Sequence, residues 1–499
     1  MDQVTLDFTH SKGNISRYLY GHFAEHIGGV FYDGLWVGQA SPIANILGFR
    51  QSLAESFRKL NPPVLRWPGG CYAETYDWRD GIGPRHERPT RVNWWYSHDK
   101  RLESNQVGTH EFMDFCRITG AEPYIAANMT SVTPLHIRNW IEYCNFGIGT
   151  TLSDERARNG SPEPFNVRFW GIGNENWGGG GQMTAEDCAK AYLRYSTVCD
   201  SLDKGNIKFI MCGANGHDVA WTRRLLQEYA SRKGNEVRAW GMSVHYYCGT
   251  AGSPTAFTRD EWYKQMRQAY YMRRVLDDHR AAMDEFDPER GIKLVVDEWG
   301  CWHKDGSGPS RGYNLYEQQS SMRDAVVAAL TLNLFNDRCD FVEMANVAQL
   351  CNNLHSLYLA GGEHFVETPN YHVFSMFKTH QDARHIPVVV STDVFEGEGQ
   401  PLPLLSASAS LKNGKITITI ANLDMDAARM IRLAGIGGGV SGQAEVTVLA
   451  HDDPRAHNSF ENPEMVMPIT VSRILAEGDI LEAPPASVVS IVLCPQQNG

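Results

Sequence analysis

Short apolar runs alternate with longer helical patterns from about residue 16 to about residue 380. Eight of the runs have the length and apolar content of buried strands. They are Tyr18–Phe23, Val64–Trp67, Pro123–Ala127, Val167–Ile172, Lys208–Cys212, Gly241–His245, Lys293–Val296 and Phe341–Ala345. Strands that alternate with helices form a doubly wound sheet or a closed barrel, and a count of eight favours the barrel. We therefore predict an α/β protein with a (β/α)8 TIM barrel.

One connecting helix has clear ends in the sequence. Thr184 is a suitable N-cap residue before Ala185–Leu202, and Asp187 stands three residues later, close to the pattern of a capping box. Gly205 follows the apolar periodicity and is a typical helix terminator. These signals predict a helix over Ala185–Leu202.

The pattern changes after about residue 385, where apolar and polar residues alternate with a period of two. Ser406–Leu411 and Lys415–Ala421 are two such segments, and Asn413-Gly414 between them is a strong hairpin signal. Two further segments predict strands, Glu445–Leu449 and Val488–Leu493. This part of the chain is expected to be an all-β sandwich.

The domain boundaries follow from this change of pattern. We place the barrel at residues 16–384 and the C-terminal sandwich at residues 385–499, with the glycine-rich stretch 435–442 as a loop inside it. The strand-like Val4–Phe8 lies in residues 1–15, before the barrel, and we expect it to pair with the sandwich.

Composition and charge limit the class of partner. A chain of 499 residues can hold a barrel and a second domain. The formal net charge is −12 and no basic run stands out, which argues against nucleic acid and anionic membranes as partners. No apolar run approaches the roughly 18 residues of a membrane-spanning helix. We expect neither a nucleic-acid partner nor a membrane partner.

The N-terminus and the cysteines indicate the compartment. The first residues, MDQVTLDFTHSKGN, lack the basic and apolar regions of a secretory signal. The 11 cysteines are odd in number and show neither CxxC nor Cys/His metal spacing. Reduced, buried thiols in a cytoplasmic protein explain this usage. We expect no metal and no cofactor.

Acidic residues follow the fourth and the seventh predicted strand. Active sites of barrels lie at the carboxyl ends of the strands. The fourth strand runs through Gly173 into Asn174-Glu175, and the seventh runs into Asp297-Glu298. Two glutamates therefore reach the same barrel mouth from roughly opposite sides of the ring.

Two facing carboxyl groups are what glycoside hydrolysis requires. One donates a proton to the leaving oxygen and the other attacks the anomeric carbon, at a separation of about 5–5.5 Å in retaining enzymes. The negative charge of one raises the pKa of the other, so that one acid stays protonated. A single glutamate after a strand is more often an N-cap or a surface residue. The pair, Glu175 and Glu298, is what indicates catalysis.

Several motifs also resemble a known family. The segments GNEN at 173–176 and DEWG at 297–300 are similar to the acid/base and nucleophile signatures of glycoside hydrolase family 51, the α-L-arabinofuranosidases. Further segments match in the same order along nearly the whole chain: GHFAEHIG at 21–28, LRWPGG at 65–70, YDWRDGIGP at 76–84, EFMDF at 111–115 and Ala348-Gln349-Leu350. Several motifs in register make the resemblance specific.

The resemblance implies roles for the residues around the two glutamates. Glu175 matches the acid/base and Glu298 the nucleophile. Asn174 matches a residue that bonds the sugar 2-hydroxyl and the nucleophile. Arg66 matches an arginine that supports the nucleophile, which would keep that carboxylate ionised. Tyr247 matches a tyrosine that hydrogen-bonds the nucleophile.

The resemblance also implies sugar-binding residues. Glu25 and Gln349 match sugar-binding positions at the first and eighth strands, and Trp302 matches an aromatic wall of the sugar subsite. Cys71 is a departure, because many members have a sugar-contacting asparagine there. A thiol is a poor hydrogen-bond partner for a sugar hydroxyl, so Cys71 leaves the identity of the sugar open.

Other interpretations of these residues remain open from the sequence. Arg66 can equally form a structural ion pair, and Trp302 can equally be a core aromatic. We favour a structural role for His245. The aromatic cluster Trp94–Tyr96 can stack on the aglycone or form a subunit contact, and Trp67-Pro68 can be a cis or a kinked peptide.

Together these features predict a retaining, exo-acting α-L-arabinofuranosidase. It would release terminal arabinofuranosyl units from arabinan- or arabinoxylan-type oligosaccharides or polysaccharides by double displacement. An endo-β-1,4-glucanase or another β-glycanase on the same scaffold is the alternative enzyme, and a non-catalytic carbohydrate-binding protein is the alternative of another class. The resemblance also implies a cytoplasmic homo-oligomer, often a hexamer.

Overall fold

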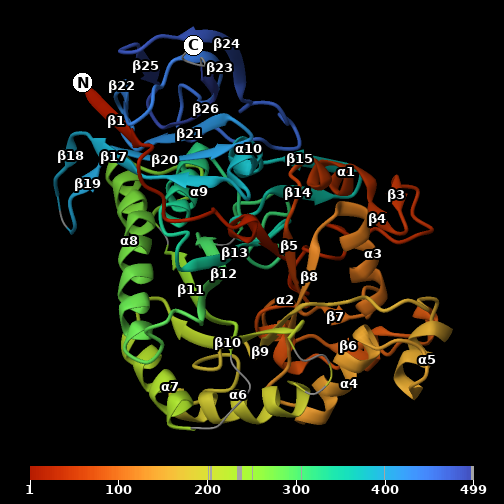
Figure 1. Cartoon of the computed structure of the whole chain (residues 1–499). Coiled ribbons are helices and arrows are strands. Elements are labelled where there is room, and N and C mark those ends of the chain that lie inside the picture. The colour runs from red at the N-terminus through yellow and green to blue at the C-terminus, as the bar shows by residue number, and fades with distance from the viewer. Residues whose placement is uncertain are drawn as a thin grey trace.

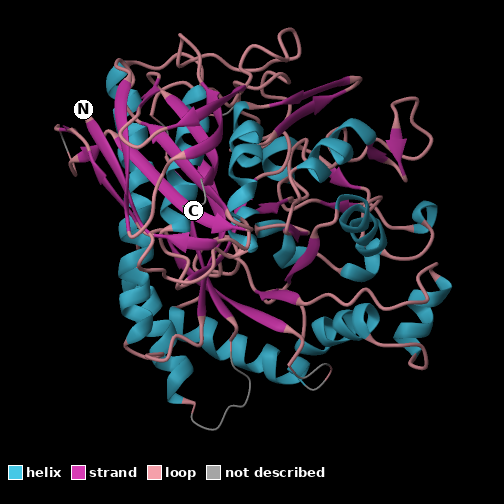
Figure 2. Cartoon of the chain, turned by 45° about the horizontal axis from the view of Figure 1, so that its top comes forward, coloured by secondary structure: helices cyan, strands magenta, loops and turns pink. Residues whose placement is uncertain are grey.

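The computed structural model describes residues 1–200, 202, 205–232, 239–249, 251–304, 306–397 and 399–495. Figure 1 shows a barrel whose strands run through the middle of the molecule, with the C-terminal β domain stacked above it. Helices surround the barrel strands, as the cyan ribbons of Figure 2 show. The N-terminal strand lies within the β domain, far from the helices that follow it in sequence.

Eight parallel strands close the barrel within the described residues. In chain order they are β2 (Gly21–Phe23), β5 (Val64–Trp67), β8 (Glu122–Ala127), β9 (Phe169–Ile172), β10 (Lys208–Asn215), β11 (Gly241–Cys248), β12 (Lys293–Cys301) and β13 (Val342–Ala348). Each strand pairs with the next, and β13 pairs with β2 to complete the ring. The predicted (β/α)8 barrel is confirmed.

Helices cover the outside of the barrel. The main ones are α1 (Gln51–Lys59), α3 (Thr109–Thr119), α4 (Pro134–Asn145), α5 (Thr151–Arg158), α6 (Ala185–Asp200), α7 (Val219–Ser231), α8 (Arg259–Asp284), α9 (Met322–Asn336) and α10 (Pro369–Phe377). Short hairpins decorate the loops: β3 (Asn45–Ile46) with β4 (Phe49–Arg50), β6 (Arg91–Val92) with β7 (Leu102–Glu103), and β14 (Tyr358–Gly361) with β15 (His364–Glu367). No described helix is both long and apolar enough to cross a membrane.

The strand predictions differ from the structure mainly at their ends. Residues Tyr18–Tyr20, which the apolar run placed in the first strand, belong to the 3-10 turn Arg17–Tyr20 instead. The turn begins there because the Ser16 hydroxyl accepts the backbone N–H of Tyr18. The strands β11 and β12 extend further than predicted, so Glu298 lies inside a strand and not after it.

The predicted helix start at Ala185 is confirmed. The Thr184 hydroxyl accepts the backbone N–H of Asp187 at 3.1 Å and lies 2.9 Å from the Asp187 carboxylate. The described part of α6 runs to Asp200, and Leu202, the predicted end, lies in a turn. The capping residues Thr184 and Asp187 therefore predicted the start of this helix correctly. The position of Gly205 predicted its end less accurately.

Two sheets of mostly antiparallel strands form the C-terminal domain. One has the order β17–β1–β22–β25 and the other β16–β20–β21–β26–β23–β24. Their strands are β1 (Asp2–Asp7), β16 (Arg384–Ile386), β17 (Val388–Ser391), β20 (Leu405–Lys412), β21 (Lys415–Asn422), β22 (Arg429–Ile436), β23 (Gly442–Leu449), β24 (Ile469–Leu475), β25 (Ile480–Ala483) and β26 (Ser487–Pro495). A small hairpin, β18 (Val394–Phe395) with β19 (Leu402–Pro403), precedes β20. The predicted all-β sandwich is confirmed.

The sandwich contains the predicted hairpin and the early strand. Asn413 and Gly414 have φ angles of 52° and 75° and join β20 to β21 in a two-residue turn. The expected loop 435–442 is shorter, because Gly435 belongs to β22 and Gly442 to β23. Strand β1 pairs with β17 and β22, and its Val4 packs in the core between the two sheets.

Helix α9 joins the sandwich to the barrel. The Asn333 side chain of α9 accepts hydrogen bonds from the hydroxyls of Ser408 and Thr419, each at 2.8 Å. From the neighbouring helix α8, the Trp262 indole donates to the backbone carbonyl of Leu423 at 2.9 Å. These buried polar contacts fix the sandwich on one side of the barrel.

Candidate active site

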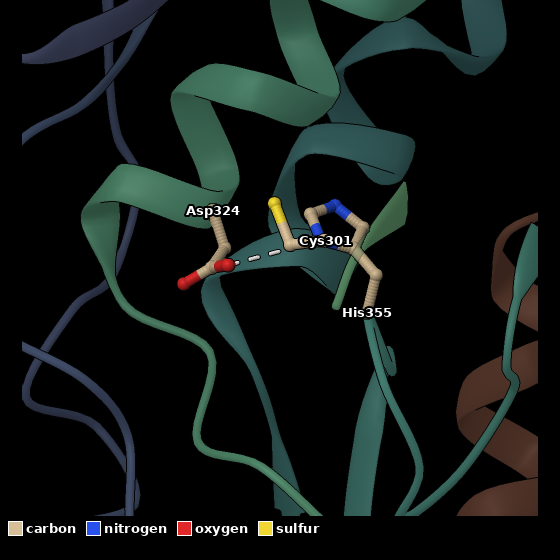
Figure 3. Close-up of side chains that lie close together, drawn as sticks. All are labelled: Cys301, Asp324 and His355. Carbon is tan, nitrogen blue, oxygen red and sulfur yellow. Dashed lines mark ion pairs between the residues drawn. The ribbon is translucent and has the colours of Figure 1, made fainter. Parts of the chain in front are cut away.

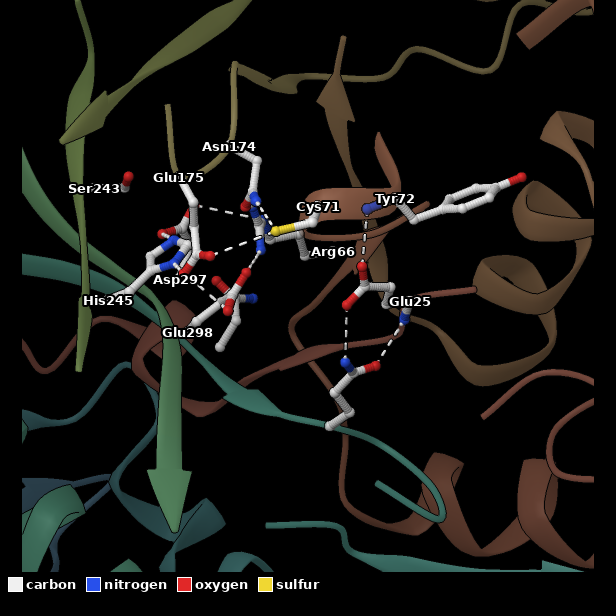
Figure 4. A network of polar contacts seen from close by, with 12 residues as sticks. Glu25, Arg66, Cys71, Tyr72, Asn174, Glu175, Ser243, His245, Asp297 and Glu298 are labelled. Atoms are coloured by element: carbon white, nitrogen blue, oxygen red, sulfur yellow. Dashed lines mark hydrogen bonds and ion pairs between the residues drawn. The ribbon is translucent and has the colours of Figure 1, made fainter. Parts of the chain in front are cut away.

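The carboxylate of Glu298 lies in the barrel mouth, on β12 (Figure 4), and side chains of two other strands hold it. The Arg66 guanidinium of β5 donates to Oε1 at 2.8 Å. The Tyr247 hydroxyl of β11 donates to Oε2 at 2.7 Å. Burial raises the pKa of Glu298, and the charge of Glu175 adds to that rise, whereas His245 and Arg66 oppose it. Arg66 therefore contacts the carboxylate, but its charge does not outweigh the effect of burial on the pKa.

Glu175 faces Glu298 from the turn that follows β9. Its side chain is 19% exposed, against 7% for Glu298, so it is the more open of the two to solvent. Its backbone adopts the left-handed conformation, with φ at 43°. Its Oε2 lies 3.5 Å from the Cys71 thiol, which donates to it. Cys71 thus touches the predicted acid/base, at the position where a sugar contact was expected.

His245 connects the two glutamates. Its Nδ1 lies 2.9 Å from Glu175 Oε1 and 3.5 Å from Glu298 Oε2, and its Nε2 lies 2.9 Å from Asp297 Oδ1. Burial disfavours the charged imidazolium, but Glu298 and Asp297 outweigh it and raise the pKa of His245 well above its ordinary value. The sequence favoured a structural role for this histidine, whereas the structure places it between both carboxylates.

The two glutamates are close together. One oxygen of Glu175, one nitrogen of His245 and one oxygen of Glu298 all lie within 4.8 Å of one another. Two carboxyl groups at this separation cannot both ionise without a large electrostatic cost unless a cation lies beside them. His245 and Arg66 supply positive charge on either side of the pair.

Arg66 is the centre of a buried network. Its Nη2 donates to Asn174 Oδ1 at 2.7 Å, and its Nε lies 3.4 Å from Asp297 Oδ2. Burial by itself would lower the pKa of Arg66, but Asp297 and Glu298 raise it. Burial likewise opposes ionisation of Asp297, yet Arg66 and His245 lower its pKa to about 2. The network orients Asn174 and Glu298 through one guanidinium.

A second cluster forms around Glu25, at the end of β2 (Figure 4). Its Oε1 accepts the Tyr72 backbone N–H at 3.0 Å and the Trp95 indole N–H at 3.1 Å. Its Oε2 accepts a hydrogen bond from the side-chain NH₂ of Gln349 at 3.2 Å. The side-chain oxygen of Gln349 accepts the Glu25 backbone N–H at 2.8 Å. Burial, aided by the charge of Glu298, raises the pKa of Glu25 to about 7.

Gly70 leaves room for two carboxylates at the point where the strand β5 turns into this site. A side chain at Gly70 would place its Cβ 2.9 Å from Glu298 Oε1 and 3.3 Å from Glu25 Oε2. The motif at 65–70 therefore lets both carboxylates approach the backbone. The peptide bond Trp67–Pro68 is cis, and so is the bond Ala348–Gln349 that precedes the Gln349 amide.

Aromatic rings line one side of the mouth. The Trp302 ring packs edge-on against Tyr247, with 5.1 Å between ring centroids, and against Tyr316, at 5.0 Å. Tyr316 in turn packs against Trp95 at 6.0 Å. Trp94 lies over the glycine run that follows Glu175, because a Cβ at Gly179 would stand 3.6 Å from its ring.

Several residues that the structure brings to the site were not predicted to belong to it. Trp95 was recognised only as part of an aromatic cluster, and Asp297 only as part of the DEWG motif. Glu74 and Tyr316 were not singled out at all. Nothing local in the sequence distinguishes them, since their partners lie in loops that are distant along the chain.

A separate buried cluster lies beside β12 and includes Cys301, Asp324 and His355 (Figure 3). Asp324 stands in the first turn of α9, where its Oδ2 accepts the Ser321 backbone N–H at 2.8 Å as part of a capping box. Its Oδ1 lies 2.9 Å from the His303 ring. The cluster ties the start of α9 to the loops that follow β12 and β13.

Comparison with known proteins agrees with this geometry. Residues 56–251 match the family described as the alpha-L-arabinofuranosidase 1 domain, and residues 297–487 match the alpha-L-arabinofuranosidase C-terminal domain. An intracellular exo-alpha-L-arabinofuranosidase of Bacteroides ovatus is 37% identical over 98% of this chain and 95% of its own. Alpha-L-arabinofuranosidase C of Emericella nidulans is 29% identical over 89% of this chain and 88% of its own.

Solved structures lead to the same family. The GH51 arabinofuranosidase of Xanthomonas axonopodis pv. citri superposes with a TM-score of 0.92 at 35% identity, over 99% of this chain and 100% of the other. The alpha-L-arabinofuranosidase of Thermotoga maritima, solved as an arabinose complex, gives 0.88 at 31% identity, over 99% and 100%. With its barrel, its paired glutamates and these relatives, the chain belongs to glycoside hydrolase family 51, the α-L-arabinofuranosidases.

Proposed function

We propose that this chain is a retaining, exo-acting α-L-arabinofuranosidase with Glu298 as nucleophile and Glu175 as acid/base. The single observation that supports this best is the separation of the two glutamates, whose facing oxygens lie within 4.8 Å of each other. That distance suits direct attack by one carboxylate, whereas inverting enzymes need about 6.5–9.5 Å to admit a water molecule. The name of the Bacteroides ovatus relative supports exo action.

The reaction proceeds in two displacements. Glu298 attacks the anomeric carbon and forms a glycosyl–enzyme ester while the glycosidic C–O bond breaks. Glu175 gives its proton to the departing oxygen, so the aglycone leaves as an alcohol. Glu175, now a carboxylate, takes a proton from water, which attacks the same carbon and displaces Glu298. The hydrogen bonds that Arg66 and Tyr247 donate to Glu298 orient this carboxylate for both steps.

The imidazolium of His245 suits the change of charge between these steps. It lies 2.9 Å from Glu175 and 3.5 Å from Glu298. In the first step Glu298 loses its charge and Glu175 gains one, so the total charge beside His245 stays constant. A fixed cation that contacts both groups stabilises the negative charge on either of them without moving.

We expect the buried polar groups beside the two glutamates to hold the sugar. Glu25, Gln349 and Asn174 offer fixed acceptors and donors, each at most 4% exposed, for the hydroxyls of a terminal arabinofuranosyl unit. Trp302 and Trp95 form the apolar wall. The indole of Trp95 is already bonded to Glu25, so it belongs to the sugar side of the pocket. Cys71 contacts Glu175 beside these groups.

The substrate proposal is tested with aryl glycosides. Hydrolysis of aryl α-L-arabinofuranosides, β-D-xylosides, β-D-glucosides and β-cellobiosides is followed by proton NMR of the first-formed anomer. We expect the arabinofuranoside alone to turn over rapidly and to release arabinose of retained configuration. Inverted product refutes the double displacement, and a mixture of oligosaccharides from polymeric substrate refutes exo action.

The residue assignments are tested by substitution. Glu298→Ala is expected to abolish turnover, and near-wild-type turnover by this variant would refute the nucleophile assignment. Glu175→Ala is expected to recover activity with azide, which enters the space of the missing carboxyl group and attacks the glycosyl–enzyme. A non-catalytic binding protein has no activity for azide to restore.

We also propose an intracellular homo-oligomer. The outer strand β24 exposes apolar side chains at the edge of its sheet, including Ile469 at 70% and Ile474 at 68% exposure. Exposed apolar edge strands pair with a second copy readily. Gel filtration that finds only a 56.0 kDa species refutes this assembly, and Ile474→Lys is the variant that should dissociate it.

The name of the Bacteroides ovatus relative supports an intracellular location, which cell fractionation tests.

A further inference from the structure

Glu74 is a buried carboxylate to which the proposed reaction gives no part. It stands in the 3-10 turn Cys71–Thr75 that follows β5, and only 1% of it is exposed. Its Oε1 accepts the backbone N–H of Asn174 at 2.6 Å and the side-chain amide of Asn176 at 3.0 Å. Its Oε2 accepts the backbone N–H groups of Met129 and Thr130 at 2.7 Å and 2.9 Å.

These four bonds join three loops of the barrel mouth. Glu74 itself belongs to the loop after β5, Met129 and Thr130 follow β8, and the two asparagines flank the turn after β9. All four donors are N–H groups, and each carboxylate oxygen accepts two of them. Such a carboxylate is saturated as an acceptor, so its contacts are specific to the ionised acid.

The turn between the two asparagines needs external support. Glu175 stands between them and adopts a left-handed conformation with φ at 43°. A residue with a side chain rarely adopts that conformation, and the conformation persists only where the surroundings hold it. Glu74 bonds the residue before Glu175 and the residue after it, so it holds the turn on both sides.

We propose that Glu74 is the positioning residue for the acid/base. By holding the turn Asn174–Asn176 against the loops after β5 and β8, its carboxylate aims the Glu175 side chain at His245 and at the leaving oxygen. Asn174 is held separately, because its side chain accepts from Arg66 at 2.7 Å. Loss of Glu74 therefore displaces Glu175 more than it displaces the sugar-binding groups. This inference rests on the proposed role of Glu175 as acid/base.

The perturbation is Glu74→Gln, which keeps the size of the side chain. An amide offers one acceptor oxygen, and its NH₂ group would face N–H donors where Oε1 or Oε2 now accepts. The readout is kcat/KM for two substrates, a phenyl and a dinitrophenyl α-L-arabinofuranoside. The phenyl substrate needs a proton from the acid as it leaves, whereas the dinitrophenyl group leaves without one.

We expect kcat/KM to fall on the order of 100-fold for the phenyl substrate, since a displaced acid loses most of its effect, and less than about 5-fold for the dinitrophenyl substrate. An equal loss with both substrates would overturn the proposal, because general loosening of the pocket does not depend on the leaving group. So would activity close to wild type with both. Asn176→Ala removes one of the four bonds and should give the same pattern at smaller size if Glu74→Gln fails to fold.

Two further variants make the outcome specific. Glu111→Gln alters another buried glutamate, which pairs with Arg88 and caps α3 but bonds none of the four donors of Glu74, and it should not produce leaving-group dependence. Glu175→Ala should produce that dependence strongly. If Glu175→Ala shows none, the acid/base assignment itself fails. If Glu175→Ala shows it and neither Glu74→Gln nor Asn176→Ala does, only the positioning role of Glu74 fails.

Discussion

Glu25 is expected to make the protein less stable as the pH rises, and Glu25→Gln should remove that dependence. Burial raises the pKa of the Glu25 carboxyl from its ordinary value of 4.5 to about 7, and the charge of Glu298 adds to the rise. The folded protein therefore holds a proton at Glu25 that the unfolded chain has already released. An acid with a raised pKa in the folded state destabilises that state when it ionises.

The sign and size follow from proton linkage. Below about pH 4.5 the carboxyl is protonated in both states and contributes nothing to the pH dependence. Between the two pKa values the folded state binds more protons, so stability falls as pH rises. Above about pH 7 the full penalty is present. A rise of about 2.5 pKa units corresponds to about 3 kcal/mol, most of it acquired between about pH 5 and pH 8.

Denaturant unfolding of the wild type and Glu25→Gln at a series of pH values measures this difference. The glutamine is neutral at every pH, although its amide faces the donor of Gln349 and adds a constant cost. We expect the stability of the variant relative to wild type to rise by about 2–3 kcal/mol from about pH 5 to pH 8. The change across this range, and not the offset, is the measured quantity.

Glu111→Gln is the matched control. Burial opposes ionisation of Glu111, but hydrogen bonds from Arg88 and Arg85 outweigh it and lower its pKa. Its stabilisation is complete above its unfolded value of 4.5 and is lost only at lower pH. Its stability curve should therefore be offset from wild type but parallel between about pH 5 and pH 8. Parallel curves for Glu25→Gln as well would refute the linkage argument.

Three further predictions concern single contacts. Tyr247→Phe removes the 2.7 Å hydrogen bond to Glu298, and kcat/KM should fall about 10–100-fold, as expected for a bond to a charged group; a loss below about 3-fold would contradict its orienting role. Trp95→Phe keeps an aromatic ring but removes the hydrogen-bond donor to Glu25. Steady-state kinetics should show KM raised about 10-fold with kcat nearly unchanged. A fall in kcat alone would contradict a role of Trp95 in sugar binding. Gly414→Ala should lower the free energy of unfolding by about 1–2 kcal/mol, because Gly414 has a left-handed φ of 75°, and a Cβ there meets no atom within 4 Å. The kcat/KM should stay unchanged. Unchanged stability in denaturant unfolding would contradict this prediction.

The sequence alone predicted much of this protein. Apolar runs located the barrel strands, and the Asn-Gly pair located the hairpin at Asn413-Gly414, because both depend on local patterns of burial and backbone preference. The rule that barrel strands carry chemistry at their carboxyl ends placed Glu175 and Glu298 together. The paired glutamates and the family can therefore be recognised from the amino-acid sequence itself, because these signals lie in short continuous segments.

Only the tertiary structure decided how the site is held. His245 lies beside Asp297 and Glu298 because β11 and β12 are neighbours in the barrel, and Trp95 reaches Glu25 from a hairpin 70 residues away. Glu74 bonds a turn 100 residues further along the chain. Such contacts depend on how the ring of strands closes and on where long loops fold over it. Local sequence patterns carry no record of those distances, so the groups that orient and charge this site are brought together only in the folded chain.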